Sequence, residues 1–119
     1  MSDVTTTIES LKNDVKKFIE DRDWQQFHSP KNLSMALASE IAELMDFFLW
    51  CENAASYEEL ERHRQDVEDE VADIAILIFA FCNRHNIDLS KAIEHKQIQQ
   101  AGKYPIEKCK GRWTKYTDL

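Results

Sequence analysis

Two pairs of carboxylates lie inside segments that are otherwise apolar enough to form buried helices. The first pair is Glu40-x-x-Glu43, within ASEIAELMDFFLW, and the second is Glu70-x-x-Asp73, within EDEVADIAILIFAF. A carboxylate that faces a protein core costs several kcal/mol unless a cation or a set of hydrogen bonds offsets its charge. A fold that buries both segments must therefore gather these acids around a cation, or leave them on solvated helix faces.

Helical geometry favours the first arrangement. At about 100° per residue, Glu40 falls in the middle of the apolar stripe of its helix and Glu43 falls on the edge. Glu70 lies at the edge of an equivalent stripe that contains Val67 and Val71. Two antiparallel helices joined by a short connector place both pairs around one cavity. Each pair taken singly also fits the alternative, a pair of solvated surface acids.

Four carboxylates are the ligands of a hard divalent cation, Mg²⁺ or Mn²⁺, rather than of zinc. The four histidines show neither H-E-x-x-H nor E-x-x-H spacing, which argues against a zinc protease or a di-iron bundle. No glycine-rich phosphate loop is present, which excludes a P-loop enzyme. Because phosphate chains are common partners of such a metal, the acids indicate phosphate chemistry.

Composition predicts an all-α protein with a single domain over residues 1–119. Glycine and proline number two each, and so few turn formers favour a few long helices over many strands. The net charge of −7 gives no electrostatic footprint for nucleic acid, and the most apolar run is too short to span a membrane. Three cysteines without a C-x-x-C pair, and an N-terminus unlike a signal peptide, predict a reduced, cytoplasmic protein.

Start and stop signals predict four helices, over residues 6–21, 29–51, 56–84 and 88–102. Capping boxes at Thr6-x-x-Glu9 and Ser56-x-x-Glu59 open the first and third helices, and Gly102 is the expected glycine after the fourth. The tail from residue 103 onward is expected to be irregular. Because the third helix is apolar on more than one face, we also expect a homo-oligomer.

Aromatic and basic side chains supply the other parts of a nucleotide site. Trp24 and His28 precede the predicted second helix, and Trp50 lies near its end. An aromatic pocket beside a metal suits a stacked nucleobase, although such residues also serve as hydrophobic core. Lys96, with Gln100 one turn further on, is the favoured phosphate contact. The other basic candidates for phosphate contact, each of which also fits an ordinary surface position, are Lys31 and Lys103.

The spacing of the two acid pairs resembles the E-x-x-E…E-x-x-D signature of the all-α nucleoside triphosphate pyrophosphatases, the MazG-like superfamily. The segments RDWQQFHSPKNLSMALASEIAEL, EDEVADI and KYTDL, together with Trp50, are similar to its dCTP pyrophosphatase branch. This resemblance covers nearly the whole chain. It implies a four-helix MazG-like fold that assembles as a dimer or as a dimer of dimers, a homotetramer.

The resemblance also implies an activity. The expected reaction is Mg²⁺-dependent hydrolysis of the α–β phosphate bond of a deoxynucleoside triphosphate, with dCTP preferred, giving the monophosphate and pyrophosphate. The implied cellular role is house-cleaning of the nucleotide pool. Val15 and Leu77 stand where the branch has a histidine and a tyrosine, and these departures imply a broader preference that includes dATP or modified dCTP.

The expected site has four parts. The implied metal ligands are Glu40, Glu43, Glu70 and Asp73. The candidate base- and sugar-binding residues are Trp24, His28, Trp50 and Leu77. The candidate phosphate-binding residues are Lys31, Lys96, Gln100 and Lys103. The expected catalytic residues are Glu43, as the general base, and Lys96, which balances charge on the leaving pyrophosphate.

Three other functions fit parts of the pattern. A non-catalytic helical interaction or regulatory protein explains the surplus apolar surface, but not acid pairs in phase on two helices. A divalent-cation-binding protein explains the acids, but not the aromatic and basic candidates. A nucleotide phosphohydrolase that acts at another bond or on another base, such as that of dUTP, differs only in its products.

Overall fold

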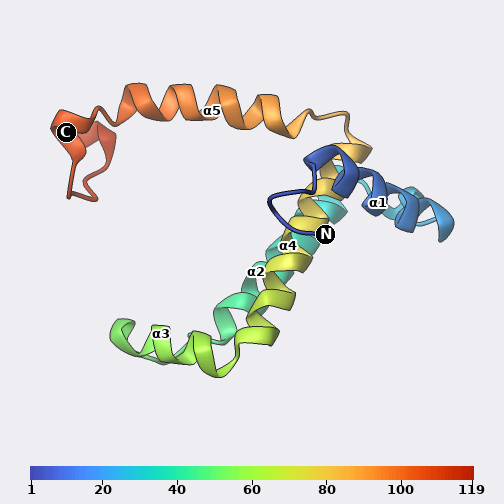
Figure 1. Ribbon diagram of the computed structural model, residues 1–119, viewed down its shortest axis with the longest axis horizontal. Coiled ribbons are helices and arrows are strands. Elements are labelled where there is room, and N and C mark those ends of the chain that lie inside the picture. Colours follow the sequence, from blue (N-terminus) through green and yellow to red (C-terminus); the bar gives the residue numbers. More distant parts are fainter. The chain divides into compact units, whose positions relative to one another are not determined.

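The computed structural model describes residues 1–119, and every regular element is a helix, which confirms the all-α prediction (Figure 1). The elements in chain order are α1 (Ile8–Asp21), the 3₁₀ helix η1 (Gln25–Phe27), α2 (Pro30–Asp46), α3 (Asn53–Arg62), α4 (Arg64–Arg84), α5 (Leu89–Lys103), α6 (Ile106–Cys109) and the 3₁₀ helix η2 (Tyr116–Asp118). The chain divides into two compact units, residues 1–86 and 87–119. None of the helices has the length and apolar character needed to cross a membrane.

Side-chain caps fix the starts of two helices where the sequence predicted them. The hydroxyl of Ser29 accepts a hydrogen bond from the backbone N–H of Asn32 at 3.1 Å, and Pro30 takes the first helical position of α2. The carboxylate of Asp88 accepts from the N–H of Lys91 at 3.0 Å and opens α5. Each cap satisfies a backbone donor that the first turn of a helix leaves without a partner.

Other predicted boundaries are wrong. The cap of α1 is Thr7, whose hydroxyl accepts from the N–H of Ser10 at 3.1 Å, so the capping box at Thr6 does not form. The second helix ends at Asp46 rather than near residue 51. Gly102 lies within the last turn of α5 instead of following it, and residues 103–119 contain α6 and η2 rather than being wholly irregular.

The predicted third helix is two helices, α3 and α4, which meet at His63 with φ −117° and ψ 27°. Two side-chain contacts of His63 accompany this break, one with α2 and one within α3. The ring of His63 lies 5.4 Å from the ring of Phe47, at the end of α2, and 3.6 Å separates its Nε2 from a carboxylate oxygen of Glu59. The helix starts before Ser56, whose hydroxyl donates to the carbonyl of Asn53 instead of forming a capping box.

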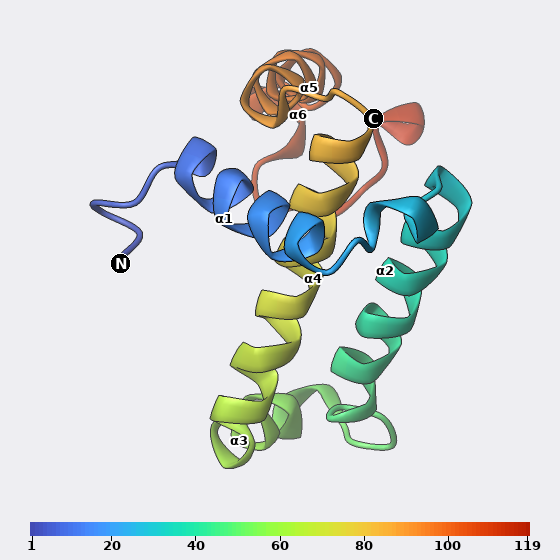
Figure 2. The ribbon, with the colours of Figure 1, turned by 90° about the vertical axis from the view of Figure 1, so that its right-hand side faces the viewer.

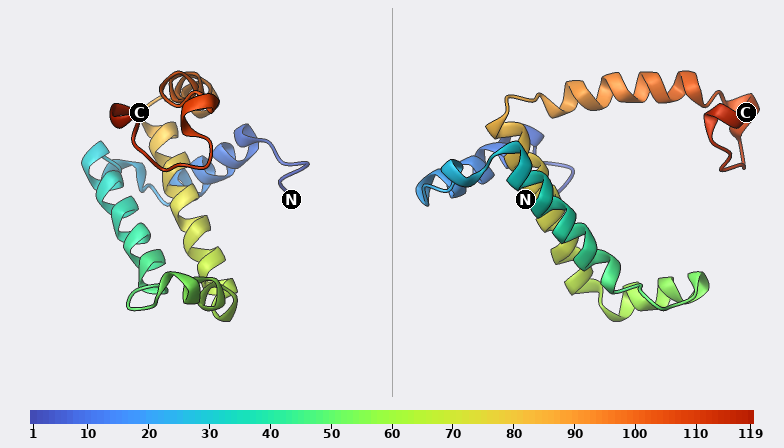
Figure 3. Two further views of the ribbon diagram at one scale, coloured as in Figure 1. Left: turned by 90° about the vertical axis from the view of Figure 1, so that its left-hand side faces the viewer. Right: turned by 180° about the vertical axis from the view of Figure 1, so that it is seen from behind.

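Within the first unit, α2 and α4 run antiparallel side by side and α1 crosses the C-terminal half of α4 (Figures 2 and 3). The core cluster consists of the buried residues Ile19, Leu33 and Ala80, with Val15, Leu77 and Phe81 packed against it. Large apolar side chains also stay exposed along α2 and α4, namely Met35, Ile41, Met45, Val71 and Ile76. The first unit therefore buries one face of its α2–α4 pair and exposes another.

The second unit is organised by two tyrosines after α5. The rings of Tyr104 and Tyr116 meet edge to face at 5.9 Å, and the hydroxyl of Tyr104 accepts from the N–H of Tyr116 at 3.4 Å. The ammonium group of Lys103 lies 4.6 Å from the centre of the Tyr116 ring. These contacts close the last residues of the chain back onto the end of α5.

Candidate active site

The antiparallel pairing of α2 and α4 brings three of the sequence-selected acids together. One carboxylate oxygen from each of Glu40, Glu43 and Glu70 lies within 4.8 Å of the other two. Glu40 and Glu43 share a face of α2 because they are three residues apart, and Glu70 faces them from α4. Asp73 stands outside this trio, one turn after Glu70 on α4.

Two oxygens of this cluster are buried without a hydrogen-bond partner, Oε2 of Glu40 and Oε2 of Glu70. The ion pairs along α1, α3 and α4 involve other acids, namely Glu20, Asp21, Glu59, Glu61 and Glu68. Buried polar atoms are nearly always satisfied in folded proteins, so two orphaned oxygens in one acid cluster need an explanation. A cation between the carboxylates, or protons shared among them, supplies one.

The acids shift one another's protonation. Burial raises the pKa of Glu40, and the hydrogen bond and the charge of Glu43 raise it further. Burial also raises the pKa of Glu70 to about 7, with the charge of Glu43 as the next cause. The charge of Asp73 contributes to the shift of Glu40, which places that carboxylate near the cluster.

The donor set fits a hard divalent cation. Its ligands would be carboxylate oxygens only, which suits Mg²⁺ or Mn²⁺ and does not suit a metal that prefers sulfur or imidazole. The orphaned oxygens of Glu40 and Glu70 supply one ligand atom from each of the two helices. Glu43 is the exposed member of the trio, so it is also open to a bound substrate or water.

The predicted aromatic residues lie in different surroundings. Trp24 follows α1 and packs edge to face against Phe18, with 5.7 Å between ring centres. Leu77 packs against the core cluster from α4. Trp50 lies in the turn after α2 with φ +71° and is 94% exposed, so no neighbour in its own chain covers the indole. A positive φ is uncommon outside glycine and costs about 1–3 kcal/mol, so the backbone at this exposed tryptophan is strained.

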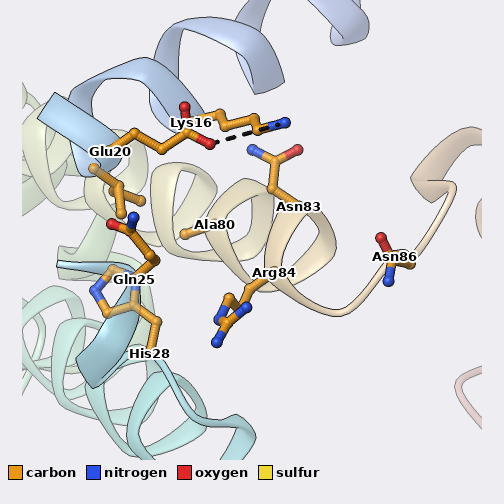
Figure 4. A pocket seen from close by; sticks show the side chains of 9 residues that line it. Lys16, Glu20, Gln25, His28, Ala80, Asn83, Arg84 and Asn86 are labelled. Atoms are coloured by element: carbon orange, nitrogen blue, oxygen red, sulfur yellow. Dashed lines mark ion pairs between the residues drawn. The ribbon is translucent and has the colours of Figure 1, made fainter. Parts of the chain in front are cut away.

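A pocket of about 250 Å³ lies beside the core cluster, between α1, the segment before α2 and the end of α4 (Figure 4). His28, a predicted base-binding residue, is in its wall. The lining residues are Lys16, Ile19, Glu20, Gln25, His28, Ala80, Asn83, Arg84 and Asn86. The sequence analysis does not indicate Gln25 or Arg84, although Gln25 directly follows Trp24 in the RDWQQFH segment.

The predicted phosphate-binding residues are divided between the two units. Lys31 lies exposed in the first turn of α2, whereas Lys96, Gln100 and Lys103 lie on α5 in the second unit. The contact of Lys103 with the Tyr116 ring fixes the ammonium group at the end of α5. Their role toward a phosphate chain stays a prediction.

Comparisons with known proteins give a consistent result. The model of the MazG-like family matches residues 35–119. Over 115 residues, 95% of this chain and 68% of the relative, the chain is 33% identical to dCTP pyrophosphatase 1 of Rattus norvegicus and 35% identical to that of Bos taurus. A solved structure, a pyrophosphatase from Archaeoglobus fulgidus, superimposes with a TM-score of 0.79 at 33% identity, covering 82% of this chain and 92% of that one.

Proposed function

This chain belongs to the MazG-like family and is a nucleoside triphosphate pyrophosphohydrolase, and we propose that dCTP is its preferred substrate and Mg²⁺ its cofactor. The family resemblance that the acid pairs predicted is thereby confirmed. The observation that carries the proposal is the carboxylate trio from α2 and α4, with its two orphaned buried oxygens. Carboxylates gathered in this way repel one another unless a cation lies between them.

In the proposed site, the cation would be held by Glu40, Glu43 and Glu70, the trio that α2 and α4 bring together, and by Asp73 from the next turn of α4. When bound, Mg²⁺ neutralises charge on the triphosphate oxygens and so favours the transition state. Glu40 and Glu70 are each half-buried and serve as ligands, while the exposed Glu43 is the residue that substrate and water can reach.

We assign Glu43 as the general base. The oxygen of a water molecule forms a bond to the α-phosphorus while a proton of that water passes to the Glu43 carboxylate. The bond between the α-phosphorus and the bridging oxygen breaks, and pyrophosphate leaves with the electron pair. Lys96 is proposed to balance the negative charge of the leaving pyrophosphate, and Lys31, Gln100 and Lys103 to contact the phosphate chain. The residues proposed to bind the base and sugar are Trp24, His28, Trp50 and Leu77.

We further propose that the enzyme is a homodimer or homotetramer. Met35 and Met45 on α2 are 64% and 60% exposed, and Val71 on α4 is 51% exposed, although all three lie on the helices that form the core. Large apolar side chains left exposed on neighbouring helices are typical of an interface between subunits. The cytoplasmic location, the house-cleaning role and the absence of a nucleic-acid partner stay predictions from the sequence.

The proposal is tested by incubating the protein with a panel of dNTPs and NTPs in Mg²⁺, with and without EDTA, and resolving pyrophosphate from orthophosphate. We expect pyrophosphate release that is fastest with dCTP and abolished by EDTA. Faster release from another nucleotide would overturn the dCTP preference. Full activity in EDTA would overturn the assignment of the acids to a metal.

A further inference from the structure

The pocket beside the core cluster contains a buried hydrogen-bond acceptor that no group of the chain satisfies. Oε1 of Gln25, in η1, is fully buried from solvent and has no hydrogen-bond partner. Gln25 lines the pocket together with His28, and the two side chains lie next to one another in Figure 4. A buried acceptor left without a donor costs about 1–3 kcal/mol, and a ligand that brings an N–H or O–H group would remove this cost.

The opposite wall of the pocket supplies donors. Arg84, at the end of α4, forms no ion pair with a carboxylate, whereas Lys16 is balanced by Glu20 at 3.9 Å. Burial and then the charge of Arg84 lower the pKa of His28, so His28 is the neutral neighbour of a free guanidinium group. Guanidinium carries N–H donors only and cannot change roles to suit a ligand.

The pocket lies further along α4 than the acids, on nearly the same side of the helix as Asp73, the acid beside the trio. At about 100° per residue, Ala80 and Arg84 each fall within about 20° of Asp73 around the helix. Ala80 is about 10 Å from Asp73 along the axis at 1.5 Å per residue. Leu77 lies between them and packs into the core cluster. A nucleotide whose α-phosphate is at the acids can therefore lay its sugar over this apolar stretch and place its base at the pocket.

We propose that this pocket reads the base of the substrate, with Gln25 accepting from the 4-amino group of cytosine and Arg84 donating to its N3 and O2. This inference rests on the proposed function and adds to it the two residues that set specificity. Uracil and thymine have an N3–H donor and an O4 acceptor, which would set donor against donor at Arg84 and acceptor against acceptor at Gln25. Adenine, like cytosine, has an amino group next to a ring nitrogen that accepts hydrogen bonds, so dATP should be the second-best substrate.

The test measures kcat/KM of Gln25→Leu, of the wild type and of a matched control, Gln26→Leu. Gln26 is an exposed neighbour whose amide donates to the carbonyl of Asp23, outside the pocket. The substrates are dCTP and the 2-pyrimidinone deoxynucleoside triphosphate, which lacks only the 4-amino group. In the wild type and in Gln26→Leu, loss of this group should lower kcat/KM about ten-fold or more, because it leaves Gln25 unpaired. In Gln25→Leu the two substrates should be equal within about two-fold.

Two further variants strengthen the test. Gln25→Glu keeps an acceptor oxygen with nearly the same shape, so it should retain the effect of the 4-amino group even if Gln25→Leu folds poorly. Arg84→Met removes the donors and should lower the ratio of dCTP to dUTP turnover about ten-fold. Circular dichroism and thermal melts compare the folding of each variant with that of the wild type.

The outcomes separate the two proposals. If the wild type hydrolyses dCTP and every variant keeps the wild-type ratios of kcat/KM between substrates with different bases, the pocket does not read the base, but the proposed function stands. If the wild type hydrolyses no nucleotide, the proposed function fails and the inference fails with it. Equal use of dCTP and the analogue by the wild type would also overturn the role of Gln25.

Discussion

Protons and Mg²⁺ should compete for Glu70. With a pKa of about 7, this carboxyl is half protonated at neutral pH before a cation binds. The ionised fraction of the Glu70 carboxyl group is roughly one-tenth at pH 6 and roughly nine-tenths at pH 8. A hard cation binds only the ionised form, so the apparent dissociation constant for Mg²⁺ should rise about ten-fold from pH 8 to pH 6. Glu40, whose pKa is also raised, acts in the same direction.

The assay is isothermal titration calorimetry of the nucleotide-free protein with Mg²⁺ at several pH values between 6 and 8. Measurement in two buffers of different ionisation heat gives the number of protons that binding releases, which should be about half a proton from Glu70 at pH 7. Glu68→Gln is the matched control. Glu68 is an exposed residue of α4 whose carboxylate lies 3.8 Å from a guanidinium nitrogen of Arg64, outside the acid cluster.

A dissociation constant that is the same at pH 6 and pH 8, with no proton released, would refute this reasoning. It would mean that Glu70 is already ionised across that range or is not a ligand. If Glu68→Gln changed the pH dependence as much as Glu70→Gln, the effect would belong to the overall charge of α4 rather than to the cluster.

Three more predictions concern the acids and the exposed apolar side chains of α2. Glu40→Gln and Asp73→Asn should each lower turnover about 10²-fold or more while leaving a folded protein, and near-normal rates in either would remove that residue from the metal site. In urea unfolding without metal, the free energy of unfolding should fall as pH rises from about 4.5 through about 7, because the raised pKa of Glu70 means that the folded state binds more protons than the unfolded one. Glu70→Gln should flatten this pH dependence. A free energy of unfolding that rises between these pH values would contradict the prediction. Met45→Glu places a charge on the exposed apolar face of α2 and should shift the oligomer toward monomer in light scattering, and an unchanged mass would place the subunit interface elsewhere.

The positions of the acids could be read from the sequence because they depend on local geometry. The 3.6-residue period of a helix fixes which face Glu40 and Glu43 share, whatever surrounds them. The start of α2 was equally local, since Ser29 and Pro30 carry the cap and the first helical position within two residues. The facing of Glu70 toward α2 then followed from the antiparallel pairing of neighbouring helices.

The features that the sequence did not reveal depend on contacts between distant segments. The break at His63 coincides with its contact with Phe47, a residue of a different element, and helical periodicity continues through it without a signal. Gln25 and Arg84 share a pocket only because α1 crosses α4, where the amide of Asn83 donates to the carbonyl of Lys12 at 2.7 Å. No spacing along the chain predicts such a crossing.

The central claim is that water attacks the α-phosphorus of dCTP at the carboxylate cluster. It is tested most directly by hydrolysing dCTP in water enriched in ¹⁸O and locating the label by mass spectrometry. The account predicts that the heavy oxygen enters dCMP and that unlabelled pyrophosphate is released. Label in pyrophosphate would mean attack at the β-phosphorus, and release of labelled orthophosphate would mean cleavage at the terminal phosphate. Either result would contradict the account.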